Sequence, residues 1–174
     1  PTLNGLKKMN HPYNGFLYAG LMITNNEPYL IEYNVRMGDP ECQTIMTLLE
    51  TDLVNIIEAT IAGKISDLEI SWKKEKSMCI VLCSKGYPNT YKKNIEIDKI
   101  DNLILDKKSL VFHAGTYEKN GKIYSNGGRV LNFVTLSNSL REARKKGSSL
   151  IKKLNWNNGF FRKDIGWKSI INNK

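Results

Sequence analysis

Two short runs of mainly apolar residues near the start of the chain predict a β-hairpin. Residues 15–24 (GFLYAGLMIT) are almost all aromatic, aliphatic or small, which is typical of a buried strand. The next four residues (NNEP) form a turn cluster, and residues 29–36 (YLIEYNVR) predict a second strand. We therefore expect a hairpin over residues 15–36 that ends at the Gly-Asp-Pro of residues 38–40.

Beyond that break, apolar residues recur at the spacing of one helix face. They are Ile45, Leu48, Leu49, Leu53, Ile56, Ile57 and Ile61. The acidic Glu41 lies in the first turn, where it complements the helix dipole, and Gly63 supplies a C-terminal stop. The pattern predicts one long, continuous helix from Glu41 to the glycine.

The second half of the chain alternates short apolar strands with turn clusters. The expected strands cover residues 77–84, 110–114, 122–124 and 129–136. Ser137 is the expected N-cap of a following helix. The apolar face of that helix carries Leu140, Ala143, Gly147, Leu150, Ile151 and Leu154. The tail (NNGFFRKDIGW) has the composition of a loop.

These elements predict an α/β (α+β) fold in two parts. The pattern changes over residues 63–76 from helical spacing to short apolar strands, which predicts a domain boundary there. We expect a first domain over residues 1–70, made of the β-hairpin plus the long helix. We expect a second over residues 71–174, a small antiparallel α+β domain.

Composition narrows the class of protein. The 174 residues are 41% hydrophobic and 25% charged, as expected of a globular protein with a packed core. No apolar run reaches the roughly 18 residues that span a bilayer, so we expect no membrane partner. Three cysteines without metal-type spacing favour a reducing, cytoplasmic location. The chain starts at Pro1 with neither an initiator Met nor a signal pattern, so we expect it to be cut from a longer protein.

The formal net charge of +9 raises the question of nucleic acid. The lysines are spread through predicted loops and helix surfaces, with few aromatic residues between them. A surface that binds nucleic acid requires its basic residues to cluster on one face, so we expect no nucleic-acid partner. We expect the positive field to attract phosphorylated substrates instead. A basic nucleic-acid-binding module without catalysis stays open as the alternative.

Polar side chains on the second strand of the hairpin predict a metal site. Glu32, Asn34 and Arg36 are two residues apart, so they share one face of the strand. A carboxylate and a carboxamide oxygen are ligands that Mg²⁺ accepts, with phosphate oxygens and waters completing its shell. A guanidinium can pair with a phosphoryl group in a bidentate fork. The alternative from spacing alone is a solvated strand face with a Glu–Arg ion pair.

Five stretches of the chain, in this order, resemble one enzyme family. They are LYAGLMI (residues 17–23), IEYNVRMGDPE (31–41), VFHAGT (111–116), NGGRVL (126–131) and FFRKDIGW (160–167). Together they are similar to the phosphoribosylamine–glycine ligase (glycinamide ribonucleotide synthetase) family of ATP-grasp ligases. The likeness runs over essentially the whole chain, and five ordered motifs are far more specific than the Glu-x-Asn-x-Arg strand alone.

The resemblance implies that this chain is part of an enzyme of purine biosynthesis. Family members use ATP as co-substrate and Mg²⁺ or Mn²⁺ to join glycine to 5-phosphoribosylamine, giving glycinamide ribonucleotide, ADP and phosphate. In this reading, residues 1–70 are the C-terminal part of the ATP-grasp domain, and residues 71–174 are the C-terminal domain of the ligase. The implied partners are these small molecules and the upstream part of the same polypeptide.

The resemblance also implies roles for single residues. Glu32 and Asn34 match the metal-binding pair, and Arg36 matches a catalytic Arg that faces the phosphoryl group. Asp39 and Glu41 fall at a turn that faces substrate, although both acids can equally do no more than stabilise the helix N-terminus. The loop of Gly127, Gly128 and Arg129 matches a substrate-binding loop that suits a ribose phosphate, with a solvated hairpin turn as the alternative.

Two departures from the family pattern affect these expectations. Many ATP-grasp enzymes place another acidic metal ligand on the partner strand, where this chain has Ala19, Gly20 and Leu21. The parts that hold adenine and cover the triphosphate lie upstream of Pro1 in the family, so we expect this chain alone to be inactive. Another ATP-grasp ligase of purine or carboxylation chemistry is the closest rival, and it would lack the NGGRVL and DIGW stretches.

Overall fold

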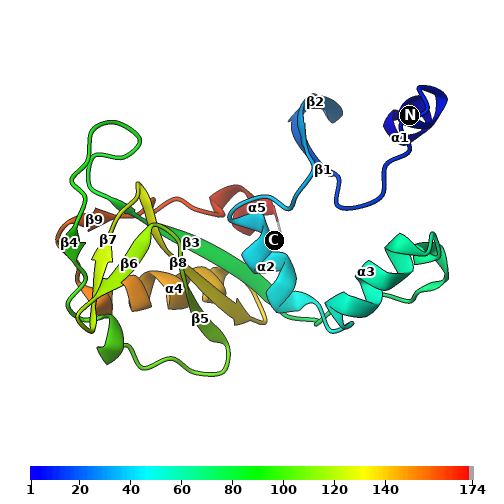
Figure 1. Ribbon diagram of the computed structural model, residues 1–174. Helices are drawn as coiled ribbons and strands as arrows, with labels where there is room; N and C mark the ends of the chain where they lie inside the picture. The colour runs from blue at the N-terminus through cyan, green and yellow to red at the C-terminus, as the bar shows by residue number, and fades with distance from the viewer. Residues whose placement is uncertain (173–174) are drawn as a thin grey trace. The chain divides into compact units, whose positions relative to one another are not determined.

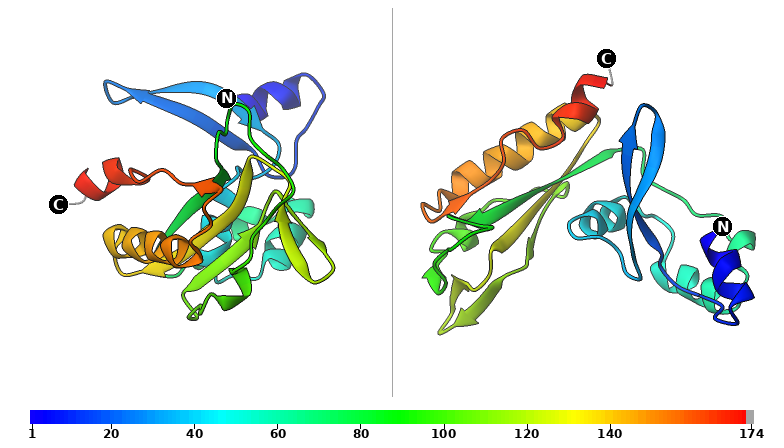
Figure 2. Two further views of the ribbon diagram at one scale, coloured as in Figure 1. Left: turned by 90° about the vertical axis from the view of Figure 1, so that its left-hand side faces the viewer. Right: turned by 90° about the horizontal axis from the view of Figure 1, so that it is seen from above.

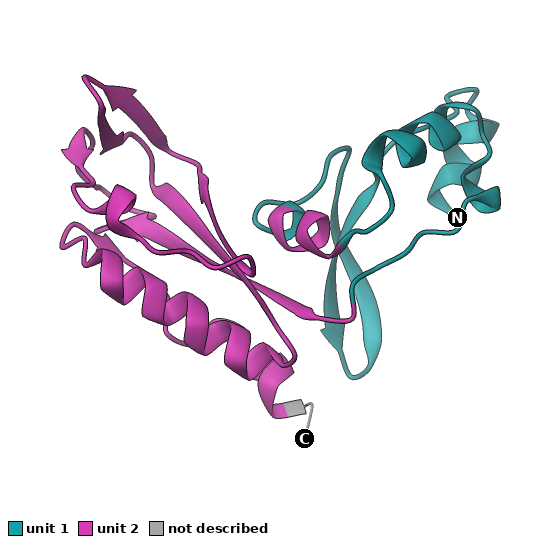
Figure 3. Ribbon diagram, turned by 90° about the horizontal axis from the view of Figure 1, so that it is seen from below, with its two compact units in different colours: residues 1–42, 49–73 teal, residues 43–48, 74–174 magenta. Residues whose placement is uncertain are grey.

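The computed structural model describes residues 1–172 and contains helices and antiparallel strands in mixed order (Figure 1; Figure 2). The chain divides into two compact units, which are coloured separately in Figure 3. Unit 1 consists of residues 1–42 and 49–73, and unit 2 consists of residues 43–48 with the chain from residue 74 onward. This mixture is an α+β fold, as expected, and the assignment of residues 1–70 and 71–174 to family domains stays a prediction.

Unit 1 contains the predicted hairpin. Strands β1 (Tyr18–Thr24) and β2 (Glu27–Asn34) pair antiparallel, with a register shift between Gly20 and Leu21. The hairpin is therefore confirmed, but β2 ends at Asn34, so Arg36 lies beyond the strand that was predicted to carry it. The predicted burial of the first strand is wrong. A short helix, α1 (Thr2–Lys8), precedes it and was not anticipated. The buried apolar side chains of the described chain all lie outside unit 1, so the aliphatic residues of this hairpin are exposed on both of its faces.

The single long helix predicted after the hairpin is wrong. The structure has α2 (Glu41–Leu48) and α3 (Leu53–Ile61), followed by the 3₁₀ turn η1 (Ile65–Asp67). The break has two causes. Asp52 caps α3 by accepting a hydrogen bond of 2.7 Å from Val54 N. Residues 49–51 pair with the segment at 71–72 instead of continuing the helix, through an isolated bridge from Leu49 to Trp72 and a bond from Glu50 N to Ser71 O.

Unit 2 is built on two antiparallel sheets. The larger sheet has the order β5-β8-β3-β9, and the smaller has the order β4-β7-β6. The larger contains β5 (Ser109–His113), β8 (Arg129–Ser137), β3 (Lys76–Ser84) and β9 (Gly159–Phe160). The smaller contains β4 (Ile95–Glu96), β7 (Lys122–Ser125) and β6 (Thr116–Lys119). The four predicted strands are confirmed, whereas β4, β6, β9, the 3₁₀ turn η2 (Ile100–Asn102) and helix α5 (Trp167–Asn172) were not anticipated.

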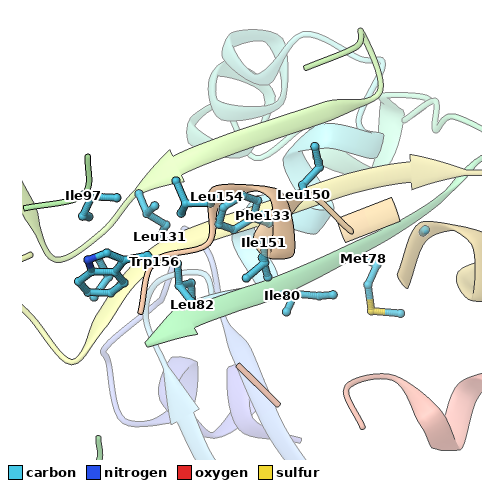
Figure 4. Close-up of a cluster of buried hydrophobic side chains, with 12 residues drawn as sticks. Met78, Ile80, Leu82, Ile97, Leu131, Phe133, Leu150, Ile151, Leu154 and Trp156 are labelled. Carbon is cyan, nitrogen blue, oxygen red and sulfur yellow. The ribbon is translucent and has the colours of Figure 1, made fainter. Parts of the chain in front are cut away.

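Helix α4 (Leu140–Leu154) lies along one face of the larger sheet and closes the core of unit 2 (Figure 2). Ala143, Leu150 and Leu154 face the sheet, as the spacing predicted. They pack with strand residues such as Ile80 and Phe133, both fully buried (Figure 4). These contacts explain why unit 2 has a core of its own: the inward faces of β3 and β8 carry aliphatic and aromatic residues at a period of two.

The N-terminus of α4 is capped by Ser139, not by Ser137 as predicted. Ser139 Oγ accepts a hydrogen bond of 3.2 Å from Glu142 N, so it satisfies one of the free amides of the first turn. Ser137 Oγ instead donates to Glu142 Oε2 at 2.8 Å. Strand β8 runs one residue further than the pattern predicted and includes Ser137, and the cap of the helix lies two positions later.

Replacing Ser139 with alanine is expected to lower the free energy of unfolding by about 1 kcal/mol, because the capped amide loses its acceptor. Urea denaturation of the 174-residue chain measures the change. Ser149→Ala is the matched control, since Ser149 is exposed in the middle of the same helix and alanine favours the helix there. Equal losses in the two variants would remove the assignment of the cap.

No helix within residues 1–172 combines the length and the apolar character that crossing a membrane requires.

Candidate functional site

Strand β2 brings Glu32 and Asn34 together on one face. Asn34 Nδ2 donates a hydrogen bond of 2.8 Å to Glu32 Oε1. The position opposite Glu32 across the hairpin is Gly20, and a Cβ there would lie 3.2 Å from Glu32 Cγ. The partner strand that lacks an acidic residue thus leaves room for the Glu32 side chain. The two polar groups lie side by side, as their spacing along the strand predicted.

The turn after β2 carries the other charged residues that were predicted for this site. Arg36 Nη1 donates to Met37 O at 3.0 Å, so the guanidinium folds back toward the turn. Asp39 precedes Pro40, and Glu41 is the first residue of α2. Gly38 is buried, and a side chain at Gly38 would collide with the Glu41 carboxylate. Gly38 O accepts the first helical hydrogen bond, 2.8 Å from Cys42 N.

Tyr18 belongs to this group of side chains and was missed by sequence reasoning. Its hydroxyl donates to Glu41 Oε1 at 3.3 Å. The Glu41 carboxylate is the main reason that the pKa of Tyr18 lies above its ordinary value; the charge of Glu32 adds to the rise and that of Arg36 opposes it. Glu32, Arg36 and Glu41 are therefore all within electrostatic reach of the Tyr18 hydroxyl. Only the position of Tyr18, directly across from Asn34, could have indicated this.

The Glu32–Asn34 pair fits a Mg²⁺ site that is completed by substrate. The carboxylate and the carboxamide supply two hard oxygen donors at one place, and the O and N of the amide are assigned from its hydrogen bond. Residues 1–172 contain no cluster of three or more His, Cys, Asp or Glu side chains arranged for a metal. Mg²⁺ commonly keeps several waters and takes phosphate oxygens, so this strand could hold it with two protein ligands.

A second group of candidate residues lies in unit 2, in the loop between β7 and β8. Gly127 and Gly128 form the loop, and Arg129 is the first residue of β8, paired with Cys83 on β3. Partial burial raises the pKa of the Cys83 thiol, and the nearby positive charge of Arg129 opposes that rise. Within residues 1–172, the amide N–H groups of Gly127 and Gly128 donate to no protein acceptor. Two adjacent amides beside an arginine can bind an anion.

Two family models match the chain. The model described as "Phosphoribosylglycinamide synthetase, C domain" matches residues 77–168. The model described as "Phosphoribosylglycinamide synthetase, ATP-grasp (A) domain" matches residues 1–42, the segment that contains Glu32, Asn34 and Arg36.

Proteins named phosphoribosylamine–glycine ligase are similar over nearly the whole chain. The one from Agrobacterium fabrum is 45% identical over 174 residues, which are 100% of this chain and 41% of the relative. The chloroplastic one from Arabidopsis thaliana is 40% identical over 98% of this chain and 33% of the relative. A crystal structure of the Thermotoga maritima ligase superposes with a TM-score of 0.78 at 37% identity, over 94% of this chain and 40% of that one. The chain thus spans about two fifths of the length of such relatives.

Proposed function

Because this chain belongs to the phosphoribosylglycinamide synthetase family, we propose that it forms part of an ATP-dependent ligase of purine biosynthesis. The ligase joins glycine to 5-phosphoribosylamine and yields glycinamide ribonucleotide, ADP and phosphate. The observation that carries the proposal is the family match over residues 77–168 of a 174-residue chain. The likeness to named ligases over the whole chain supports it.

Glu32 and Asn34 are the proposed ligands of Mg²⁺ (or Mn²⁺). A divalent cation there would neutralise charge on the phosphoryl group of ATP as it is transferred. Arg36 is the proposed catalytic cation, which pairs with that group through its planar fork. The hydrogen bond between Asn34 and Glu32 supports their assignment as metal ligands, since it keeps the carboxamide and the carboxylate next to each other.

Asp39, Glu41 and the loop of unit 2 are the proposed substrate-binding groups. An ammonium or amine nitrogen can be oriented by the carboxylates of Asp39 and Glu41, and Tyr18 holds Glu41 through its hydroxyl. The amides of Gly127 and Gly128, with the guanidinium of Arg129, suit the ribose phosphate of 5-phosphoribosylamine. The absence of a protein acceptor for these amides within residues 1–172 supports that role.

The proposed partners are ATP, glycine, 5-phosphoribosylamine and the remaining part of the ligase, which in the relatives accounts for about three fifths of the length. The exposed apolar side chains of the hairpin, such as Ile23 at 61% and Ile31 at 63%, support a surface that another part of the enzyme covers. Cys42, Cys79 and Cys83 form no disulfide within residues 1–172, which supports a reducing cytoplasmic location.

A chimera tests this function. The aligned 174 residues of the Agrobacterium fabrum ligase are replaced by this chain, which is 45% identical to them. We expect the chimera, but not the isolated chain, to form glycinamide ribonucleotide with stoichiometric release of phosphate from ATP. Turnover by the isolated chain would contradict the expectation that catalysis requires the rest of the ligase. A folded chimera without turnover, beside an active parent, would contradict the function itself. Salt-dependent binding of generic duplex DNA that is unaffected by Glu32→Ala would favour the nucleic-acid alternative.

A further inference from the structure

The loop of Gly127 and Gly128 is held from one side by Ser84, the last residue of β3. Ser84 Oγ donates a hydrogen bond of 2.8 Å to Gly127 O, and Ser84 N donates one of 2.8 Å to Gly128 O. Ser84 is 2% exposed, so both bonds are shielded from water. Two successive carbonyl groups of the loop are therefore fixed by one buried residue.

Tyr87 packs on the same loop. Its ring lies directly against the α-carbon of Gly128, where any Cβ would overlap the ring carbons. Tyr87 N donates to Ser84 O at 3.0 Å, and the Tyr87 ring meets that of Tyr91 edge to face at a centroid distance of 6.1 Å. The turn that begins at Ser84 thus supplies both the hydrogen bonds and the packing surface for the loop.

Gly115 contacts the loop from a second segment. Asn126 N donates to Gly115 O at 2.7 Å, and Gly115 N donates to Arg129 O at 2.9 Å. A Cβ on Gly115 would lie 2.7 Å from the α-carbon of Gly127, so the two backbones touch. The carbonyl groups of Gly127, Gly128 and Arg129 are all bonded to neighbouring protein.

These contacts decide which way the loop amide of Gly128 points. The carbonyl of Gly127 and the N–H of Gly128 belong to one planar, trans peptide group, so they point in opposite directions. Ser84 Oγ binds that carbonyl, and the N–H of Gly128 is consequently turned away from Ser84. The Tyr87 ring packs against the α-carbon of Gly128, so it restricts displacement of this residue and of its N–H toward the ring.

We propose that Ser84 and Tyr87 are positioning residues, which fix the loop of Gly127 and Gly128 so that the amide of Gly128 is oriented toward the phosphate of the substrate. This inference rests on the proposed phosphate-binding role of the loop. Neither residue touches the phosphate: Ser84 acts through the Gly127 carbonyl, and Tyr87 acts through the α-carbon of Gly128. The ring of Tyr87, rather than its hydroxyl, carries the effect.

Loop order in the 174-residue chain tests the positioning without any ligand. ¹H–¹⁵N NOE values of Gly127 and Gly128 are measured by NMR in the wild type and in Ser84→Ala, Tyr87→Ala and Tyr87→Phe. We expect the values to fall in both alanine variants and to stay at the wild-type level in Tyr87→Phe, which keeps the ring. Unchanged values in both alanine variants would overturn the positioning.

A titration with ribose 5-phosphate, followed at the same amides, tests the functional consequence. We expect Ser84→Ala and Tyr87→Ala to raise the Kd by roughly tenfold, about one lost charge-assisted hydrogen bond, and Tyr87→Phe to leave it unchanged. A disordered loop with an unchanged Kd would show that the contacts are merely structural and would overturn the inference. No shifts in the wild type would instead reject the phosphate-binding role, while the NOE values still decide the positioning.

A double variant tests the contact between Tyr87 and Gly128 directly. Gly128→Ala places a methyl group against the Tyr87 ring, so it should disorder the loop and raise the Kd for ribose 5-phosphate. In the Tyr87→Ala background the same substitution should have little further effect, since the ring is gone. Additive effects of the two substitutions would contradict the contact.

Discussion

Replacing Glu32 with alanine is expected to lower the ligase activity of the chimera by at least about a hundredfold. Loss of a group that only supports a metal ligand typically lowers affinity or activity by roughly 10- to 100-fold, and a direct ligand should matter no less. Asn34 loses its hydrogen-bond acceptor in the same variant, so its amide is also released. The chimera should then need a higher Mg²⁺ concentration for half-maximal activity, which a Mg²⁺ titration at saturating ATP measures.

Two further variants separate metal binding from a general effect of charge. Glu27→Ala removes an exposed carboxylate from the same strand and should leave the Mg²⁺ titration unchanged. Asn34→Ala removes no charge but should shift the titration in the same direction as Glu32→Ala. Titrations that are unchanged in both Glu32→Ala and Asn34→Ala would refute the assignment of the two ligands.

In unit 2, elements were predictable where one face is buried against the rest of the unit. Helix α4 shows this most clearly, since Ala143, Leu150 and Leu154 recur at helical spacing and all lie against the larger sheet. The break between α2 and α3 was not predictable in this way. Leu48, Leu49 and Leu53 keep the helical spacing through it, and the break is set by pairing with Trp72, which lies more than twenty residues away.

In the candidate site, too, the local pattern predicted some residues and missed those with partners distant in the chain. The period of two along β2 was enough to bring Glu32 and Asn34 together. Tyr18, Ser84 and Tyr87 were missed because their partners are distant in the chain: the Tyr18–Glu41 bond spans 23 residues and the Ser84–Gly127 bond spans 43. The local sequence around Tyr87 is an ordinary Gly and Pro turn, and nothing in it indicates the loop on which it packs.

Phe133→Ala should produce the largest loss of stability in unit 2. Phe133 is fully buried at the centre of β8, across from Ile80 on β3 and Val111 on β5, so alanine leaves a cavity between two strands and α4 (Figure 4). Removing a buried phenyl ring costs about 3–5 kcal/mol, a large share of the roughly 5–15 kcal/mol that holds a domain folded. Urea denaturation of the 174-residue chain, followed by tryptophan fluorescence, should show a midpoint lowered by roughly 2 M.

The matched control for this prediction is Phe112→Ala. Phe112 lies on the neighbouring strand β5 and is 37% exposed, so the same change of side chain removes less buried area. Its loss should be well under half of that for Phe133, because water already reaches the ring and little cavity remains. Equal losses would mean that the core of unit 2 is not centred on β8. A larger loss for Phe112 would place the main packing on the sheet face opposite α4.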